Sequence, residues 1–159
     1  MKRLALILLF TLFAMSGYAQ TIKLNAPDVE IKFKRCIASG GSAYVDLVMT
    51  NWSGKEFSGL LTHQEQMASA SYDNYYTAVY DDEGNMYRHN SLSFSFAGES
   101  SYSFYAPCEI PIKVRIYIRN LDEYASEIKL LKMAFRGMPS AEPYGAALLE
   151  IRDIPITRQ

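Results

Sequence analysis

Alternation of apolar and polar residues at period two is the feature that most constrains the fold of this chain. It is strictest over residues 112–119, Ile-Lys-Val-Arg-Ile-Tyr-Ile-Arg, and it recurs over 29–36, where Val29, Ile31 and Phe33 alternate with charged residues. Successive side chains of a β-strand point to opposite faces, so each segment is predicted to be a strand with one buried face.

Further strands are expected between turn signals rich in Gly, Asn and Ser, at residues 44–50, 75–80, 86–87, 92–96, 102–104, 127–135 and 145–156. The 92–96 and 102–104 segments are predicted to form a hairpin around Gly98 to Ser100. Seven to nine short strands, with a turn about every ten residues, predict an all-β fold: an antiparallel β-sandwich of immunoglobulin-like type. A parallel α/β fold would need long helices between strands, for which residues 29–117 leave no room.

The segment that follows residue 119 fits two patterns. Asn120 and Glu123 have the spacing of a helix cap, and Leu121, Tyr124 and Ile128 follow at helical spacing. Residues 128–135 fit an extended strand equally well. We therefore expect one short helical turn near 122–126, followed by a strand over 127–135.

The N-terminus has the pattern of a signal peptide. Lys2 and Arg3 precede an almost wholly apolar run from Leu4 to Met15, and small residues up to Ala19 follow it. The apolar run of about a dozen residues is too short for a transmembrane helix of ~20 residues. The prediction is a cleaved signal peptide over 1–19 and a single domain over 20–159. This domain would be exported to the periplasm or the cell exterior, with no membrane span.

Charge excludes one class of partner. The chain of 159 residues has 16 basic and 17 acidic side chains, and without residues 1–19 it has 14 and 17, a formal net charge of −3. Nucleic acid and anionic membranes attract concentrated positive charge, so no nucleic-acid partner is expected.

Two cysteines, Cys36 and Cys108, lie in the exported part. Disulfides persist in oxidising compartments, which predicts a Cys36–Cys108 disulfide. The alternatives are two buried thiols or a reactive thiol. A reactive thiol would need a histidine partner or an electropositive pocket, and neither His63 nor His89 lies near a cysteine in the sequence.

Motifs for catalysis and cofactor binding are absent from the sequence. It has no His-Glu-x-x-His, Cys-x-x-Cys, Gly-x-Ser-x-Gly or phosphate loop. The acidic segment 81–85 lacks the spacing of an EF-hand, so a solvated hairpin turn is favoured over a calcium site. We expect no catalytic residue, no cofactor and no metal, although a glycosidase pair could hide among the 17 acidic residues.

Several turn and strand signatures carry a family resemblance: Thr50-Asn51-Trp52-Ser53-Gly54, then 80–87, then 110–116 leading to Tyr124, Ile128 and Leu131. With them the chain resembles the secreted immunoglobulin-like domains of unknown function that are common in the Bacteroides group of bacteria. The similarity covers most of residues 28–156 and implies a fold and an exported location. The resemblance implies no functional residue in this chain.

Aromatic residues provide the candidate binding site. Tyr72, Tyr75 and Tyr76 lie in a segment with small polar neighbours, and Trp52 lies elsewhere. Such rings pack a sandwich core or, when exposed, bind a partner. The predicted function is a non-catalytic protein-interaction or structural accessory module of the cell envelope. A carbohydrate-binding module that uses exposed tyrosines is the alternative, and a glycan-active enzyme is a weaker one, so the partner is an unidentified protein or glycan.

Overall fold

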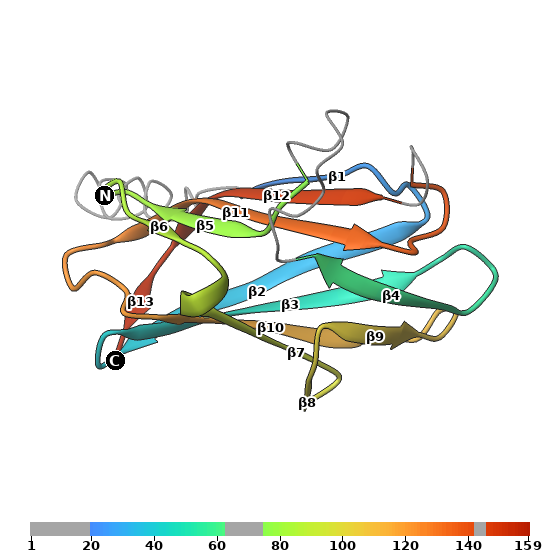
Figure 1. The fold of residues 1–159 in the computed structure, drawn as a ribbon, viewed down its shortest axis with the longest axis horizontal. Helices are drawn as coiled ribbons and strands as arrows, with labels where there is room; N and C mark the ends of the chain where they lie inside the picture. Colours follow the sequence, from blue (N-terminus) through green and yellow to red (C-terminus); the bar gives the residue numbers. More distant parts are fainter. Residues whose placement is uncertain (1–19, 63–74, 142–145) are drawn as a thin grey trace, which may run out of the picture.

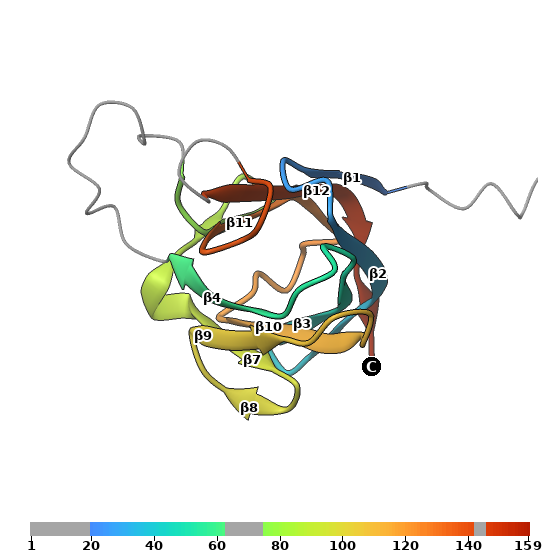
Figure 2. The same ribbon diagram turned by 90° about the vertical axis from the view of Figure 1, so that its right-hand side faces the viewer.

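The computed structural model describes residues 20–62, 75–141 and 146–159. They form two β-sheets packed face to face, seen from the side in Figure 1 and along the strands in Figure 2. The all-β sandwich predicted from the alternation is thereby confirmed. The predicted signal peptide and Tyr72 lie outside the described residues.

The first sheet has seven strands. They are β1 (Thr21–Leu24), β4 (Phe57–Thr62), β5 (Ala78–Asp81), β6 (Met86–Tyr87), β9 (Ser103–Ala106), β11 (Glu127–Arg136) and β12 (Ala147–Pro155). The main order is β1-β12-β11-β4-β9, while β5 pairs with β11 and with β6. All of these pairings are antiparallel.

The second sheet has six strands. They are β2 (Val29–Ser39), β3 (Ser42–Asn51), β7 (Leu92–Phe96), β8 (Glu99–Ser100), β10 (Ile112–Arg119) and β13 (Thr157–Arg158). Their order is β13-β2-β3-β10-β7-β8. The pairings are antiparallel except for that of β13 with β2, which is parallel.

The core lies between the sheets and follows the predicted alternation. On β10, Val114, Ile116 and Ile118 are buried, and the residues between them are partly or fully exposed. On the facing sheet, Leu131 and Met133 of β11 are fully buried. Figure 2 shows β11 and β12 in one layer and β3, β10 and β7 in the other.

Four strands, β1, β4, β8 and β13, were not predicted. β4 contains Gly59, and a glycine weakens the strand pattern when the sequence is considered alone. In the structure a Cβ atom at Gly59 would lie 2.2 Å from Cζ of Phe104, so the glycine makes room for a core ring within a strand. Close packing of the Phe104 ring explains why a glycine occupies this position.

The hairpin predicted around Gly98 is only partly correct. β7 does turn back into β8 through Ala97 and Gly98, whose φ angles of 52° and 94° suit a two-residue hairpin turn. The next strand, β9, leaves this sheet and pairs with β4 in the other one. Its Phe104 ring then stacks on Phe96 across the sandwich, with ring centroids 4.7 Å apart. Alternation along the chain carries no information about which sheet a strand joins.

The helical turn predicted near 122–126 is wrong. Residues 123 and 124 form a bend and their neighbours have no regular structure, and among the described residues the helical turn is the 3-10 turn η1 (His89–Ser91). Asp122 explains the difference, because its Oδ1 accepts the backbone N–H of Tyr124 at 2.8 Å and its own N–H donates to the Tyr87 hydroxyl at 3.0 Å. Such side-chain contacts compete with helical hydrogen bonds. The described part of the chain holds no helix long and apolar enough to cross a membrane.

The predicted disulfide is also wrong, since Cys36 and Cys108 are both free thiols. Cys36 of β2 pairs with Val45, whereas Cys108 bridges to Asn51 at the far end of β3. At ~3.3 Å per residue, the length of β3 between Val45 and Asn51 puts the two cysteines on the order of 20 Å apart. A disulfide needs Cα atoms within about 7 Å. Burial raises the pKa of the Cys36 thiol to about 12, so this cysteine is an unreactive core residue.

Candidate binding surfaces

Tyr76, one of the predicted binding residues, precedes β5 on the seven-stranded sheet. Its hydroxyl lies 3.0 Å from that of Tyr80, and Nζ of Lys132 lies 4.0 Å from its ring centroid. The guanidinium carbon of Arg88 lies 5.3 Å from the same centroid. The hydrogen bond with Tyr80 raises the pKa of Tyr76, and burial lowers the pKa of Lys132. The Tyr76 ring thus already makes cation–π contacts with two cations of the protein itself.

Tyr75 lies beside a separate hollow of about 570 Å³ that β1 and β12 border. Its hydroxyl accepts a hydrogen bond from Asn25 Nδ2 at 3.4 Å, and Asn25 Oδ1 accepts the N–H of Leu148 at 2.5 Å. Lys23 and Glu150 also line the hollow. Tyr75 is half-buried and lines this hollow.

Trp52, the other described candidate, lies at the end of β3 on the six-stranded sheet. Its side chain is 54% exposed, and its Nε1 donates to Glu30 at 3.4 Å. The structure therefore places Trp52 on a different sheet from the one that Tyr75 and Tyr76 adjoin.

The Asp81 carboxylate in the acidic turn after β5 accepts hydrogen bonds from the protein itself. Asp81 is buried, and its Oδ1 accepts the backbone N–H groups of Glu83 at 3.0 Å and Asn85 at 2.8 Å. Its Oδ2 accepts the Tyr87 hydroxyl at 2.7 Å. Asp81 closes the β5–β6 hairpin, and these oxygens are engaged by protein donors.

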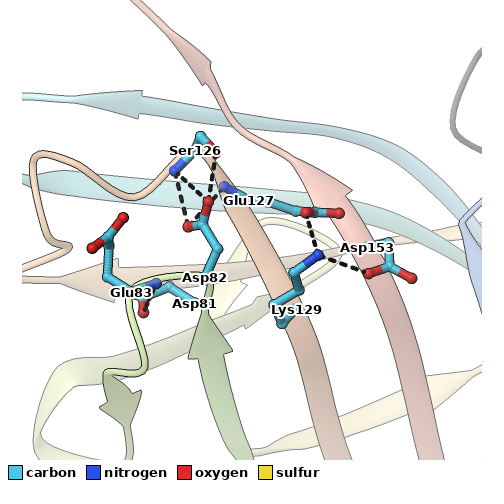
Figure 3. Close-up of polar contacts among 7 residues, drawn as sticks. All are labelled: Asp81, Asp82, Glu83, Ser126, Glu127, Lys129 and Asp153. Carbon is cyan, nitrogen blue, oxygen red and sulfur yellow. Dashed lines mark hydrogen bonds and ion pairs between the residues drawn. The ribbon is translucent and has the colours of Figure 1, made fainter.

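Asp82 ties the same turn to the start of β11 (Figure 3). It accepts the backbone N–H groups of Ser126 at 3.0 Å and Glu127 at 3.2 Å, and the Ser126 hydroxyl at 2.5 Å. Burial raises the pKa of Asp82, but these hydrogen bonds outweigh it and lower the pKa overall. Within residues 20–62, 75–141 and 146–159, no three or more His, Cys, Asp or Glu side chains gather as metal ligands do.

A different site appears on the outer face of the six-stranded sheet, around Asp46 of β3. Asp46 is 3% exposed although it points away from the core. Arg115 of β10 donates to it from Nε at 2.6 Å and from Nη2 at 2.8 Å, and Arg35 of β2 donates from Nε at 2.9 Å. Nζ of Lys113 lies 3.8 Å from the same carboxylate. Burial raises the pKa of Asp46, but the hydrogen bonds from Arg115 and Arg35 outweigh it and lower the pKa. Three cations share one carboxylate, which leaves an excess of positive charge.

Two tyrosines hold the central arginine of this cluster. The guanidinium carbon of Arg115 lies 4.3 Å from the ring centroid of Tyr44 and 5.7 Å from that of Tyr117. The register explains this contact, because Tyr44 and Tyr117 are paired neighbours one step along from the Asp46–Arg115 pair. Cation–π contacts and a bidentate carboxylate fix the guanidinium in one orientation.

The cluster belongs to a larger surface that we call the β3 face. We define it by twelve outward-pointing residues of four adjacent strands and of the chain directly after β3: Glu30, Lys32, Arg35, Tyr44, Asp46, Trp52, Ser93, Ser95, Lys113, Arg115, Tyr117 and Arg119. Val48 and Thr50 of β3 point the same way and lie between Asp46 and Trp52. Five of the twelve are basic and two are acidic, although the chain beyond residue 19 is acidic overall. The rest of that chain holds nine basic and fifteen acidic residues.

Sequence reasoning missed this face, although part of its signal was visible. The alternation over 112–119 marks Lys113, Arg115, Tyr117 and Arg119 as one face of a strand. Asp46 and Arg35 join them only through the pairing of β3 with β10 and β2. A single sequence does not reveal that register.

A second hollow, of about 530 Å³, lies where β9 meets the β7–β8 hairpin. Phe96 and Phe104 line it together with Ser101, Ser103 and an exposed Tyr105. The Tyr105 hydroxyl donates to Glu56. The residues that line this hollow include no cation, in contrast to the β3 face.

Comparisons with known proteins add little to these observations. No protein-family model and no curated protein matches the chain. Among solved structures it is similar to the copper-bound PCuAC domain from PmoF2, with 12% identity and a TM-score of 0.46, over 91% of this chain and 100% of that one. A likeness at this level supports no inference about a ligand, so the function has to be argued from the residues themselves.

Proposed function

We propose that this chain is an exported, non-catalytic binding module of the cell envelope and that the β3 face is its binding surface. The observation that carries the proposal is the Asp46 cluster, in which Arg35, Lys113 and Arg115 gather around one buried carboxylate on an open sheet face. Buried charge without full neutralisation is costly, which makes such a cluster an unusual way to cover a sheet.

The composition of the β3 face supports binding. Trp, Tyr and Arg dominate the binding energy of protein interfaces, and Trp52, Tyr117 and Arg35 are all well exposed here. Arg115 and Tyr44 are already fixed by their mutual contact, so a partner would lose little side-chain entropy on meeting them.

Export and the absence of catalysis are further parts of the proposal. Export rests on the signal-peptide pattern of residues 1–19 and on the resemblance to secreted immunoglobulin-like domains. The non-catalytic role is supported by the state of the carboxylates, because Asp46, Asp81 and Asp82 all accept hydrogen bonds within the fold.

Site-specific photo-crosslinking in the native host tests the proposal. A phenylalanine derivative with a diazirine on its ring, which keeps an aromatic side chain, replaces Tyr117, which is 40% exposed on the β3 face, or Leu60, which is 46% exposed on β4 of the other sheet. We expect defined adducts from position 117 and none from position 60. Adducts of equal yield at both positions, or from position 60 alone, would reject the β3 face as the binding surface.

A further inference from the structure

We infer that the ligand of the β3 face is an acidic polysaccharide, a glycan whose sugar rings carry carboxylates. This inference rests on the proposed function and adds the chemical class of the ligand. Three kinds of group on the face support it: cations with free capacity, serine hydroxyls and exposed aromatic rings.

The cations can accept a second carboxylate. Arg35 engages Asp46 through Nε, and its side chain is 53% exposed, so its terminal nitrogens can reach a ligand. Lys113 lies on the other side of β3, is 51% exposed and approaches Asp46 only to 3.8 Å. A carboxylate placed between Arg35 and Lys113 would receive charge-assisted hydrogen bonds from both. Arg115 is only 21% exposed and acts as a positioning residue that keeps Asp46 in place.

Serine hydroxyls lie next to the cations. Ser95 of β7 is paired with Arg115, and Ser93 is paired with Tyr117, so both project onto the β3 face. Hydroxyls donate and accept hydrogen bonds, as the hydroxyl groups of a sugar do. An acidic peptide would use the cations but would have fewer hydroxyl groups to pair with these serines.

Aromatic rings flank the cations at both ends. Trp52 follows β3 at one end, and Tyr44 with Tyr117 lies at the other. At ~3.3 Å per residue, Tyr44 and Trp52 are about 26 Å apart, a span that calls for an extended ligand. Ring faces provide apolar platforms for sugar rings, and a polymer with repeated carboxylates can reach the rings and the cations together.

Charge distribution favours an anionic polymer over a neutral one. The β3 face carries five basic and two acidic residues, and the remainder of the exported chain is acidic. An anionic chain would therefore be attracted to this face and repelled from the others, which orients the encounter.

The test is calorimetric titration of the full exported chain with alginate oligosaccharides, in calcium-free buffer at low ionic strength. The variant R35Q/K113Q removes two cations from the β3 face and leaves the Asp46–Arg115 pair intact. Its matched control, K129Q/R152Q, removes two exposed cations from the seven-stranded sheet, where they pair with Glu127 and Glu150. Y117S removes a ring without changing the charge. Dextran oligosaccharides supply sugar rings without carboxylates, and polyglutamate supplies carboxylates without sugar rings.

We expect the Kd for alginate to rise at least roughly tenfold in R35Q/K113Q, to rise in Y117S and to stay within about twofold in K129Q/R152Q. Dextran and polyglutamate should bind at least roughly tenfold more weakly than alginate. No alginate binding, equal weakening in both double variants, or equal binding of dextran or polyglutamate would each overturn the inference. Crosslinks from position 117 would then still uphold the β3 face as a binding surface, so the two proposals can fail separately. Thermal unfolding of each variant shows that the comparison is made between folded proteins.

Discussion

Asp46 shows how much a single residue can determine on this surface. Its carboxylate is 3% exposed and is shared by Arg35, Lys113 and Arg115, so its removal leaves three cations facing one another. We expect D46N to lower the free energy of unfolding at neutral pH by about 2 kcal/mol. D46E is the control, because it keeps the charge.

The pH dependence of this effect follows from the lowered pKa of Asp46. Since the folded-state pKa lies below the unfolded value of about 3.9, the stabilisation is fully present above about pH 5 and is lost as pH falls through the folded-state pKa. Urea denaturation of wild type and D46N across this range measures it. The difference between the two proteins should shrink below about pH 4. A difference that stays constant down to pH 3 would contradict the assigned role of Asp46.

The two cysteines should differ in reactivity. Cys36 is buried with its pKa raised to about 12, whereas Cys108 is half-buried near the end of β3. Without reductant, a thiol reagent should label one cysteine, Cys108, in the folded protein and both after denaturation. Mass spectrometry locates the labels. If no thiol is labelled in the denatured protein, the two cysteines form a disulfide and their assignment as free thiols is wrong.

At the scale of strands, the contact between β4 and β9 depends on Gly59. The Phe104 ring that covers it is stacked on Phe96 and lies edge-on to Phe57 and Phe135, with centroids 6.0 and 5.8 Å away, so it has little freedom to move aside. G59A should therefore lower the free energy of unfolding by about 2 kcal/mol through overpacking.

The matched control for G59A is S58A, because Ser58 is the exposed neighbour on the same strand. It should leave the free energy of unfolding within about 0.5 kcal/mol of the wild-type value. Chemical denaturation compares the two variants. Equal stability of G59A and S58A would contradict this prediction, because it would show that the Phe104 ring can move aside at little cost.

The strand with the strictest alternation was predicted correctly from the sequence, whereas four strands, β1, β4, β8 and β13, were missed. The alternation over 112–119 identified β10 and its buried face correctly. β4 was missed because Gly59 interrupts its pattern, and the helical turn near 122–126 was wrong because Asp122 binds its neighbours. Long-range pairing decided the rest, including the sheet that β9 joins.

The candidate site, too, depends on long-range strand pairing that one sequence does not reveal. Trp52 was singled out for its residue type, and it does lie on the β3 face. The Asp46 cluster on the same face, formed by Arg35, Asp46 and Arg115, comes from three strands whose register is a property of the folded sheet. Tyr76, chosen because it lies among small polar residues in the sequence, instead contacts Lys132 within the fold.

For the whole molecule, net charge proved a poor guide to the surface. A chain with 14 basic and 17 acidic residues beyond residue 19 suggests no affinity for anions. The sandwich nevertheless gathers five of those basic residues on one side of one sheet, because strands 112–119 and 29–39 lie on either side of β3. An average over the chain conceals this separation of charge, and local fields steer binding.

The most direct test of the β3 face is the yield of photo-crosslinks from position 117 in two charge-matched backgrounds. R35Q/K113Q neutralises two exposed cations of the β3 face, and K129Q/R152Q neutralises two on the opposite sheet. We predict that the adducts disappear in R35Q/K113Q and persist in K129Q/R152Q. Equal yields in the two backgrounds would contradict the account, because binding would then not depend on the cations around Asp46.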